Sequence, residues 1–197
     1  MYLRTVIFAH PILGHFVYVC PTHVMGETVF DGGIHEPEIV TAVQAFVRNG
    51  FSFLDCGANI GLHTLVAAFA RKDEKQIFIS FEPDASIFSV LQKNCGENGL
   101  NFVDCSHEGL GDEDTCMTLN VSLTHNKGRN SFLPIESSQP GGRVKVNRLD
   151  TLFLEKPELF KKNILIKLDV EGYELPVIRG GLESLSKIEN LTVISEI

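Results

Sequence analysis

Residues 51–61 constrain the fold of this chain more than any other stretch. A short apolar run ends in Asp55, and turn-forming residues then follow at alternate positions, namely Gly57, Asn59 and Gly61. Apolar residues at helical spacing begin directly afterwards, at Leu62. Glycine allows positive φ and a close approach of the backbone to a ligand, which the first N–H groups of a helix can then face. The segment therefore predicts a strand, a glycine loop and a helix, the opening of a nucleotide-binding α/β unit.

Most of the remaining chain repeats this alternation of strand and helix. Apolar runs predict strands over residues 51–54, 76–81, 101–105, 163–168 and 191–194. Apolar residues at helical spacing predict helices over 37–48, from 62 to about 71, from 87 to about 96, and from 176 to 185 with a break at Gly180 and Gly181. This order predicts right-handed crossovers, and hence an α/β fold with a mostly parallel, twisted sheet and helices on both faces.

Two stretches do not follow the alternation. Residues 1–35 predict short strands and turns, with a strand over 15–20 and a turn at 31–33. Between residues 112 and 148 the pattern pauses, with predicted strands at 117–122 and 144–147 and a long loop over 124–142. A loop of this length in a compact domain is functional or mobile. We therefore expect an N-terminal extension, residues 1–35, followed by one α/β domain, residues 36–197.

Composition narrows the classes of function. The formal net charge is -8 and the pI is about 5.3, so the chain lacks the basic character of a typical nucleic-acid-binding protein. The chain has 5 cysteines, which is an odd number, and no Cys-x-x-Cys motif, so free thiols in a reducing compartment are favoured. The histidines show no metal-ligand spacing. The apolar N-terminal segment is interrupted by His10, Pro11 and His15, too often for a membrane-spanning helix. We expect a cytoplasmic protein without a metal, nucleic-acid or membrane partner.

The acids near the glycine loop indicate which ligand it suits. Glu82 ends the second predicted strand, about 20 residues beyond the loop, where dinucleotide-type folds place an acid that binds ribose hydroxyls. A helix cap or a solvated acid is the alternative for Glu82. Asp55 would repel a pyrophosphate but would attract a cation. S-adenosylmethionine has a ribose at one end and an ammonium and a sulfonium at the other, so Asp55 and Glu82 together favour this cofactor.

Further motifs occur in the order of a known family. They are 55–61 (Asp-Cys-Gly-Ala-Asn-Ile-Gly), 81–83 (Phe-Glu-Pro), 149–152 (Leu-Asp-Thr-Leu) and 166–174 (Ile-Lys-Leu-Asp-Val-Glu-Gly-Tyr-Glu). With them, the chain resembles FkbM-type S-adenosylmethionine-dependent methyltransferases from about Glu36 onward. The resemblance implies a Rossmann-like class I methyltransferase fold and O-methylation of a small molecule or sugar. The family fold continues past its fifth strand with an antiparallel edge, whereas this sequence ends at Ile197, inside or just after the predicted fifth strand. We therefore expect this sheet to lack the C-terminal antiparallel edge.

The resemblance also implies cofactor contacts around the loop. Gly57 and Gly61 would serve the close approach of the cofactor, and Asn59 would cap the following helix or orient the loop. Pro83 would lie beside the ribose-binding acid. Glu36 would reach the methionine end of the cofactor, with a cap for the 37–48 helix as the alternative.

In this fold the adenine lies at the turn after the third strand, where Glu108, Gly109 and Leu110 would contact it. Asp169 and Glu171 end the fourth strand, in the crevice where such sheets bind ligands, unless they serve as helix caps. They would face the methyl group or the acceptor, and Asp169 is the candidate general base for a hydroxyl.

Structural roles are the more ordinary interpretation for several neighbouring residues. These are Asp112 as a solvated turn residue, Tyr173 and Glu174 at the start of a helix, and the histidines His63 and His107.

Two other functions remain open at this point. An NAD-type oxidoreductase shares the strand–loop–helix pattern, although Asp55 and Asn59 argue against it. A catalytically inactive domain that binds S-adenosylmethionine is the second alternative. The expected partner is a small-molecule or carbohydrate methyl acceptor. Its identity stays open because the segments expected to face it, the N-terminal segment and residues 122–142, carry little pattern.

Overall fold

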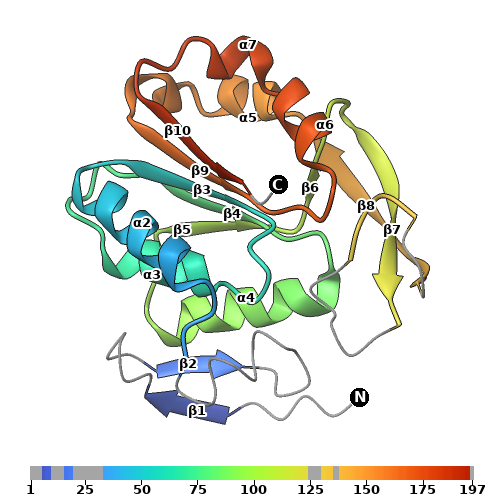
Figure 1. The fold of residues 1–197 in the computed structure, drawn as a ribbon, viewed down its shortest axis with the longest axis horizontal. Helices are drawn as coiled ribbons and strands as arrows, with labels where there is room; N and C mark the ends of the chain where they lie inside the picture. Colours follow the sequence, from blue (N-terminus) through green and yellow to red (C-terminus); the bar gives the residue numbers. More distant parts are fainter. Residues whose placement is uncertain (1–5, 10–15, 20–32, 124–129, 135–137, 196–197) are drawn as a thin grey trace.

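A five-stranded parallel sheet forms the centre of the structure, a computed structural model that describes residues 6–9, 16–19, 33–123, 130–134 and 138–195. Its strand order is β10-β9-β3-β4-β5 (Figure 1). The strands are β3 (Ser52–Cys56), β4 (Phe78–Phe81), β5 (Val103–Ser106), β9 (Ile164–Leu168) and β10 (Leu191–Ser195). All four pairings are parallel, so the predicted parallel α/β sheet is confirmed.

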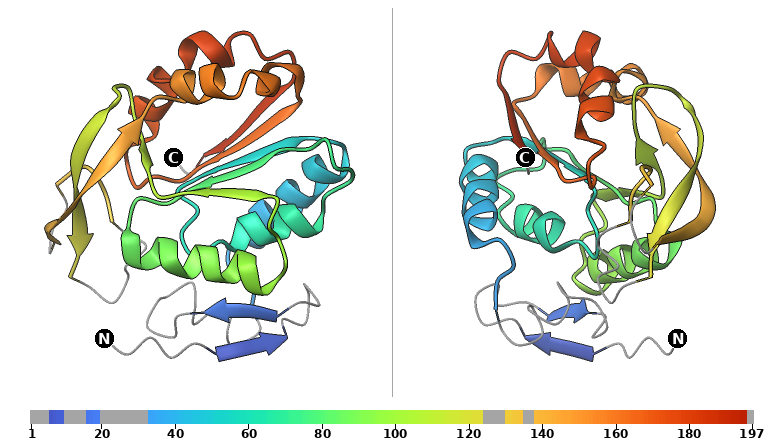
Figure 2. Two further views of the ribbon diagram at one scale, coloured as in Figure 1. Left: turned by 180° about the vertical axis from the view of Figure 1, so that it is seen from behind. Right: turned by 45° about the vertical axis from the view of Figure 1, so that its right-hand side comes forward.

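Helices cover both faces of this sheet (Figures 1 and 2). One face carries α2 (Pro37–Arg48), α3 (Leu62–Phe69) and α4 (Ala85–Glu97). The other face carries α5 (Leu149–Glu155), the 3-10 helix η2 (Pro157–Lys161), α6 (Glu174–Arg179) and α7 (Leu182–Leu185). Two apolar cores result, because strand side chains alternate between the faces. Each fully buried leucine, isoleucine or phenylalanine in them contributes about 1.5–3 kcal/mol.

The register of the sheet places a row of polar residues inside the face covered by α2, α3 and α4. Asp55 pairs with Lys167 on β9 and with Ser80 on β4. Ser80 in turn pairs with Cys105 on β5, the outermost described strand on that side. Paired residues in a parallel sheet project from the same face, so these side chains are neighbours in an otherwise apolar layer.

A smaller sheet follows β5 in the chain and corrects one prediction. Its order is β6-β8-β7, formed by β6 (Gly109–Leu110), β7 (Thr115–Ser122) and β8 (Ser138–Asn147). The predicted loop over 124–142 is wrong for 138–142, which belong to β8; residues 124–129 and 135–137 lie outside the described residues. Pro140 fits in this strand because it lies opposite Asn120, where the register shifts, and needs no ladder hydrogen bond there.

The N-terminal region contributes an antiparallel pair, β1 (Val6–Ala9) and β2 (Phe16–Val19), which lies beside α4 in both views (Figure 2). The strand predicted over 15–20 is present at 16–19, whereas most of the predicted turn at 31–33 lies outside the described residues. In the part of the chain that the structure describes, no helix combines the length and apolarity needed to cross a bilayer. The missing antiparallel edge stays a prediction.

Candidate cofactor site

The strand order reverses direction at the centre of the sheet, and a cavity lies at that point. From β3 the chain proceeds to β4 and β5 on one side, whereas β9 and β10 lie on the other. Ligands of open α/β sheets bind outside the carboxyl ends of the strands at such a switch point. The cavity has an empty volume of about 580 Å³, part of it open to solvent, which is in the range of cofactor sites. Most residues predicted from the sequence line it: Gly57, Asn59, Glu82, Pro83, Glu108, Gly109, Leu110, Asp169 and Glu171.

Three predicted residues, Glu36, Asp55 and Gly61, do not line this cavity. Asp55 is fully buried, and its Oδ2 accepts a hydrogen bond from Thr64 Oγ1 at 2.6 Å. Its Oδ1 faces the ammonium of Lys167 at 3.6 Å. The cation that Asp55 attracts in this structure is therefore a side chain of the protein.

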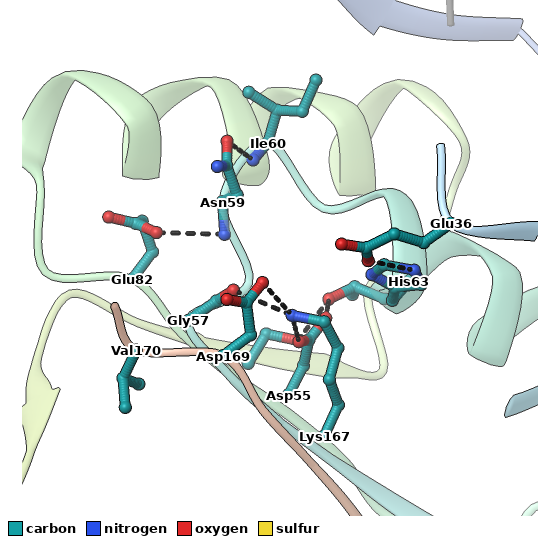
Figure 3. Close-up of polar contacts among 12 residues, drawn as sticks. Glu36, Asp55, Gly57, Asn59, Ile60, His63, Glu82, Lys167, Asp169 and Val170 are labelled. Atoms are coloured by element: carbon teal, nitrogen blue, oxygen red, sulfur yellow. Dashed lines mark hydrogen bonds and ion pairs between the residues drawn. The ribbon is translucent and has the colours of Figure 1, made fainter. Parts of the chain in front are cut away.

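Lys167 was not among the predicted site residues, and it connects them. It is 2% exposed, and its Nζ donates to the Gly57 carbonyl at 3.3 Å and to Asp169 Oδ2 at 3.1 Å (Figure 3). Together with Asp55, these groups surround the ammonium with three acceptors. The sequence held one signal for this role: a lysine inside a buried strand needs charged or polar partners.

Electrostatics favour a charged ammonium at this point. Burial acts to lower the pKa of Lys167, but the carboxylates of Asp55 and Asp169 together outweigh it and raise that pKa above its ordinary value. For Asp55, burial raises the pKa, whereas Lys167 and the Thr64 hydroxyl act in the opposite direction. We assign the ionised form to Asp55 because each of its oxygens faces a donor or a cation.

The glycine loop owes its shape to close packing as well as to the cavity. A Cβ on Gly57, which has φ +83°, would lie 1.9 Å from the Asp169 carbonyl oxygen, so only glycine lets the ends of β3 and β9 approach. A Cβ on Gly61 would meet Leu91 of α4 at 2.6 Å. Gly61 therefore also has a packing reason, and its close approach to the cofactor stays a prediction.

Non-glycine residues with positive φ occur at three described positions, and all three are predicted site residues: Glu36, Asn59 and Glu171. Such conformations cost energy and cluster at functional sites. The Oδ1 of Asn59 accepts from the N–H of Ile60 at 2.8 Å, and its own N–H donates to Glu82 Oε2 at 3.0 Å. The cap position of α3 is Gly61, so Asn59 orients the loop and does not cap the helix.

Glu82 is a buried carboxylate at the cavity wall. Its Oε1 accepts from the Asp84 N–H at 2.8 Å, in addition to the bond from Asn59. Burial raises the pKa of Glu82 to about 8, against the lowering influence of these backbone bonds. Asp84 supplies the cap of α4, so the helix-cap alternative for Glu82 does not hold.

Glu36 and His63 lie on the far side of Asp55 and Lys167 from Glu82 (Figure 3). Glu36 Oε2 is 3.5 Å from Nε2 of His63, and Oε1 is 3.6 Å from Nε2 of His35. Burial, with Lys167 and His35, lowers the pKa of His63 well below its ordinary value, which leaves the ring neutral. Glu36 occupies the cap position of α2 without a side-chain cap bond, so the capping alternative is not supported.

The Glu108 carboxylate is fixed by three side chains at the end of the cavity nearest β6. Its Oε1 accepts from Lys145 Nζ at 2.8 Å, and its Oε2 accepts from Ser106 Oγ at 2.9 Å and from Asn147 Nδ2 at 2.8 Å. The Glu108 side chain thus already has three partners, and the contact of the Glu108–Leu110 turn with adenine stays a prediction.

Residues 130–132, between β7 and β8, form part of the cavity wall. Asn130 Nδ2 donates to Asp84 Oδ2 at 3.0 Å, and Ser131 Oγ donates to the Glu171 carbonyl at 2.7 Å. Asn130, Ser131 and Phe132 all line the cavity. None of the three was predicted individually, although the surrounding loop was expected to face an acceptor.

Two of the neighbouring residues expected to be structural, Glu174 and His107, make contacts within the fold. Glu174 Oε1 accepts from the N–H groups of Val170 and Gly172 at 3.1 and 3.2 Å. His107 stacks on Phe88, with ring centroids 5.0 Å apart. Among the described residues, no group of three or more His, Cys, Asp or Glu side chains is arranged to hold a metal ion.

Taken together, these features define a class of protein. A parallel sheet with a switch point, a glycine loop after its central strand and an acid after the next strand form an α/β domain that binds a nucleotide-type cofactor. The chain belongs to the FkbM methyltransferase family: the model of the methyltransferase FkbM domain matches residues 55–197.

Two curated relatives are similar to this chain. Methyltransferase 1 from Beauveria bassiana (strain ARSEF 2860) is 31% identical over 155 residues, which cover 70% of this chain and 61% of that protein. Methyltransferase sdnD from Sordaria araneosa is 31% identical over 156 residues, which cover 64% of this chain and 59% of that protein. The chain thus matches about three fifths of the length of these curated relatives.

Solved structures give a weaker likeness. A methyltransferase FkbM from Methylobacillus flagellatus KT has 20% identity and a TM-score of 0.46, over 74% of this chain and 32% of that one. A SAM-dependent methyltransferase from Agrobacterium tumefaciens has 10% identity and a TM-score of 0.43, over 82% of this chain and 45% of that one.

Proposed function

We propose that this chain binds S-adenosylmethionine in the switch-point cavity and transfers its methyl group to an acceptor. One observation carries the proposal: the cavity wall combines the buried acid Glu82 with Asp169, and both flank the loop at Gly57. Membership in the FkbM family supports the same reaction. We also propose that residues 36–197 form the methyltransferase domain and residues 1–35 an extension.

The residues present fit this cofactor in charge and in hydrogen bonding. Glu82, Asp169 and Glu171 line the cavity with carboxyl groups, which suit ribose hydroxyls and, where ionised, an ammonium or a sulfonium. We assign the ribose to Glu82 and Pro83, and the adenine to the turn of Glu108, Gly109 and Leu110. Gly57 and Asp169, which pack closely on each other, line the same cavity.

The buried acid Asp55 then takes an indirect role. It is fully buried behind Lys167, so it acts by holding the ammonium that in turn contacts Gly57 and Asp169. Glu36 belongs to the same electrostatic neighbourhood, because it raises the pKa of Lys167 together with Asp55 and Asp169. We propose that Glu36 faces the amino-acid end of the cofactor, where its strained backbone presents a carboxylate.

S-adenosylmethionine supplies a methyl group that its sulfonium already activates. The protein must therefore align the acceptor and exclude water, and most of the acceleration comes from proximity and orientation. For a hydroxyl acceptor, we propose that Asp169 accepts the proton. Because Lys167 holds Oδ2 of this carboxylate, we assign the proton-accepting role to Oδ1. The acceptor we favour is a hydroxyl on a small molecule or a carbohydrate.

Two measurements test this proposal. Calorimetry with S-adenosylhomocysteine and with NAD separates the cofactor classes, and we expect binding of the former alone. A methyl-labelled donor is then incubated with a panel of hydroxyl acceptors and matched amines. Label on a hydroxyl supports the proposal, and label on an amine alone overturns O-methylation. Binding without labelling of any acceptor would favour the inactive cofactor-binding domain.

A further inference from the structure

Two cysteine sulfurs lie side by side where α4 packs on the edge of the sheet. Cys105 is the last member of the polar row that runs from Lys167 through Asp55 and Ser80 across the sheet. Its Sγ is 3.7 Å from Sγ of Cys95 on α4. Both side chains belong to the core between the sheet and this helix layer. The two thiols are therefore neighbours in the folded chain, although they come from different elements.

The geometry allows a bond between these sulfurs. A disulfide needs an S–S distance of about 2.0 Å, so the sulfurs must approach by about 1.7 Å. β5 is the outermost described strand on its side of the sheet and pairs there with β4 alone, so it can move toward α4 without breaking a second ladder. The remaining described cysteines differ: Cys56 is buried in the opposite core, and Cys116 is exposed on β7.

Access and thiol chemistry assign an order to the two residues. Cys105 is partly exposed, whereas Cys95 is 5% exposed. The contact with Cys95 lowers the pKa of the Cys105 thiol, because the neighbouring S–H stabilises the thiolate. An accessible thiol with a lowered pKa beside a second thiol is the arrangement of a reactive and a resolving cysteine.

We propose that Cys95 and Cys105 are a thiol modification site, oxidised reversibly to a disulfide by low-molecular-weight disulfides. The Cys105 thiolate attacks one sulfur of the reagent, forms a mixed disulfide and releases the other half as a thiolate. The Cys95 thiol, on losing its proton, then attacks Cys105 Sγ and releases the second half. The protein loses two protons and two electrons, and the S–S bond of the reagent is reduced to two thiols.

The same helix connects the cysteine pair to the glycine loop. Asn94, next to Cys95, donates from Nδ2 to the Ile60 carbonyl at 2.6 Å, and Leu91 of the same helix packs against Gly61. A bridge between α4 and β5 would restrict the helix that supports this loop. We therefore expect hydrogen exchange of residues 57–61 to slow at least about twofold in the oxidised protein.

The experiment uses the full chain and glutathione disulfide, followed by intact mass spectrometry and peptide mapping. We expect a loss of about 2 Da, a single link between Cys95 and Cys105, and full reversal by dithiothreitol. The bridge should raise the thermal midpoint by about 5 °C, because it constrains the unfolded chain and fits the native contact.

Matched variants separate this pair from the other thiols. Cys105→Ser should abolish the link, whereas Cys56→Ser and Cys116→Ser should leave it unchanged. The wild-type protein alone can overturn the proposal, either through a stable glutathione adduct on Cys105 or through a link that involves another cysteine. A lower thermal midpoint would show that the bridge does not fit the fold, and unchanged exchange of residues 57–61 would overturn the connection to the loop.

Discussion

Lys167 Nζ lies 3.1 Å from Asp169 Oδ2, and the two residues stand two positions apart at the end of one strand. Alternation along a strand puts such residues on the same face, so their contact follows from β geometry. The parallel register then adds Asp55 as the neighbour of Lys167 on the adjoining strand. A buried cation is thus held between an acid of the core and an acid of the cavity wall.

Replacement of this cation should destabilise the fold. Lys167→Met removes the ammonium and leaves the buried Asp55 carboxylate without its cationic partner, which costs about 3–5 kcal/mol of unfolding free energy. Urea denaturation followed by circular dichroism measures this loss. The control is the double variant Lys167→Met with Asp55→Asn, which removes the uncompensated charge and should recover at least about 1 kcal/mol. Equal stability of the single and double variants would contradict the ion-pair account.

Gly57 and Gly50 form a matched pair for testing the crossing of β3 over β9. Both have positive φ, +83° and +92°, so alanine at either position pays a similar backbone penalty of about 1–2 kcal/mol. A Cβ at position 50 has no atom within 4 Å, whereas at position 57 it would lie 1.9 Å from the Asp169 carbonyl oxygen. We expect Gly57→Ala to lower the free energy of unfolding by at least about 2 kcal/mol more than Gly50→Ala does, as measured by urea denaturation. The affinity for S-adenosylhomocysteine should fall at least about tenfold for Gly57→Ala alone. Similar losses for both variants would refute the close-approach argument.

The raised pKa of Glu82 predicts a pH dependence of stability. Burial raises this pKa from an ordinary value near 4.5 to about 8, so between these pH values the folded protein keeps a proton that the unfolded chain has released. The contribution of Glu82 to stability therefore falls as pH rises through this window. Glu82→Gln removes the titration. The stability of the variant relative to wild type should improve by about 1–3 kcal/mol between pH 5 and pH 9, as measured by urea denaturation at both values. A difference that does not change with pH would exclude a raised pKa.

Asp169→Asn tests the assignment of the general base. The amide keeps the size of the side chain but cannot accept the proton of a hydroxyl, so turnover should fall about 100-fold or more. Affinity for S-adenosylhomocysteine should change by less than about fivefold, because the remaining lining of the cavity is intact. Labelled methyl transfer and calorimetry measure the two quantities. Asp112→Asn, an exposed acid outside the cavity, is the control and should keep full turnover. Unchanged turnover in Asp169→Asn would remove this residue from the catalytic assignment.

Local patterns in the sequence were sufficient for the sheet, the helices that flank it and most of the cavity wall. The parallel strands and the helices α2, α3 and α4 follow from apolar periodicity, with ends that differ by a few residues. Glu82 and Asp169 could be assigned to the cavity because acids at the carboxyl ends of parallel strands share one edge of the sheet. These features depend on short stretches of chain, so they can be predicted from the sequence without knowledge of the tertiary contacts.

Residues 138–142 show where local pattern fails. The run Ser-Gln-Pro-Gly-Gly has little preference for a strand, and pairing with β7 places it in β8 regardless. Asn130 and Ser131 join the cavity wall through partners more than 35 residues away in sequence, Asp84 and Glu171. Contacts of this kind have no periodic signature and arise only when the chain is folded.

By itself, the sequence determined the α/β class, the glycine loop and the acids at the strand ends beside it, because strand ends and turn residues act locally. Tertiary structure alone decided what each acid of the loop region faces. The strand register put Lys167 between Asp55 and Asp169, so Asp55 holds a lysine of the protein, while Glu82 and Asp169 line the cavity. Which charges become partners depends on strand register and burial, and both are properties of the folded chain.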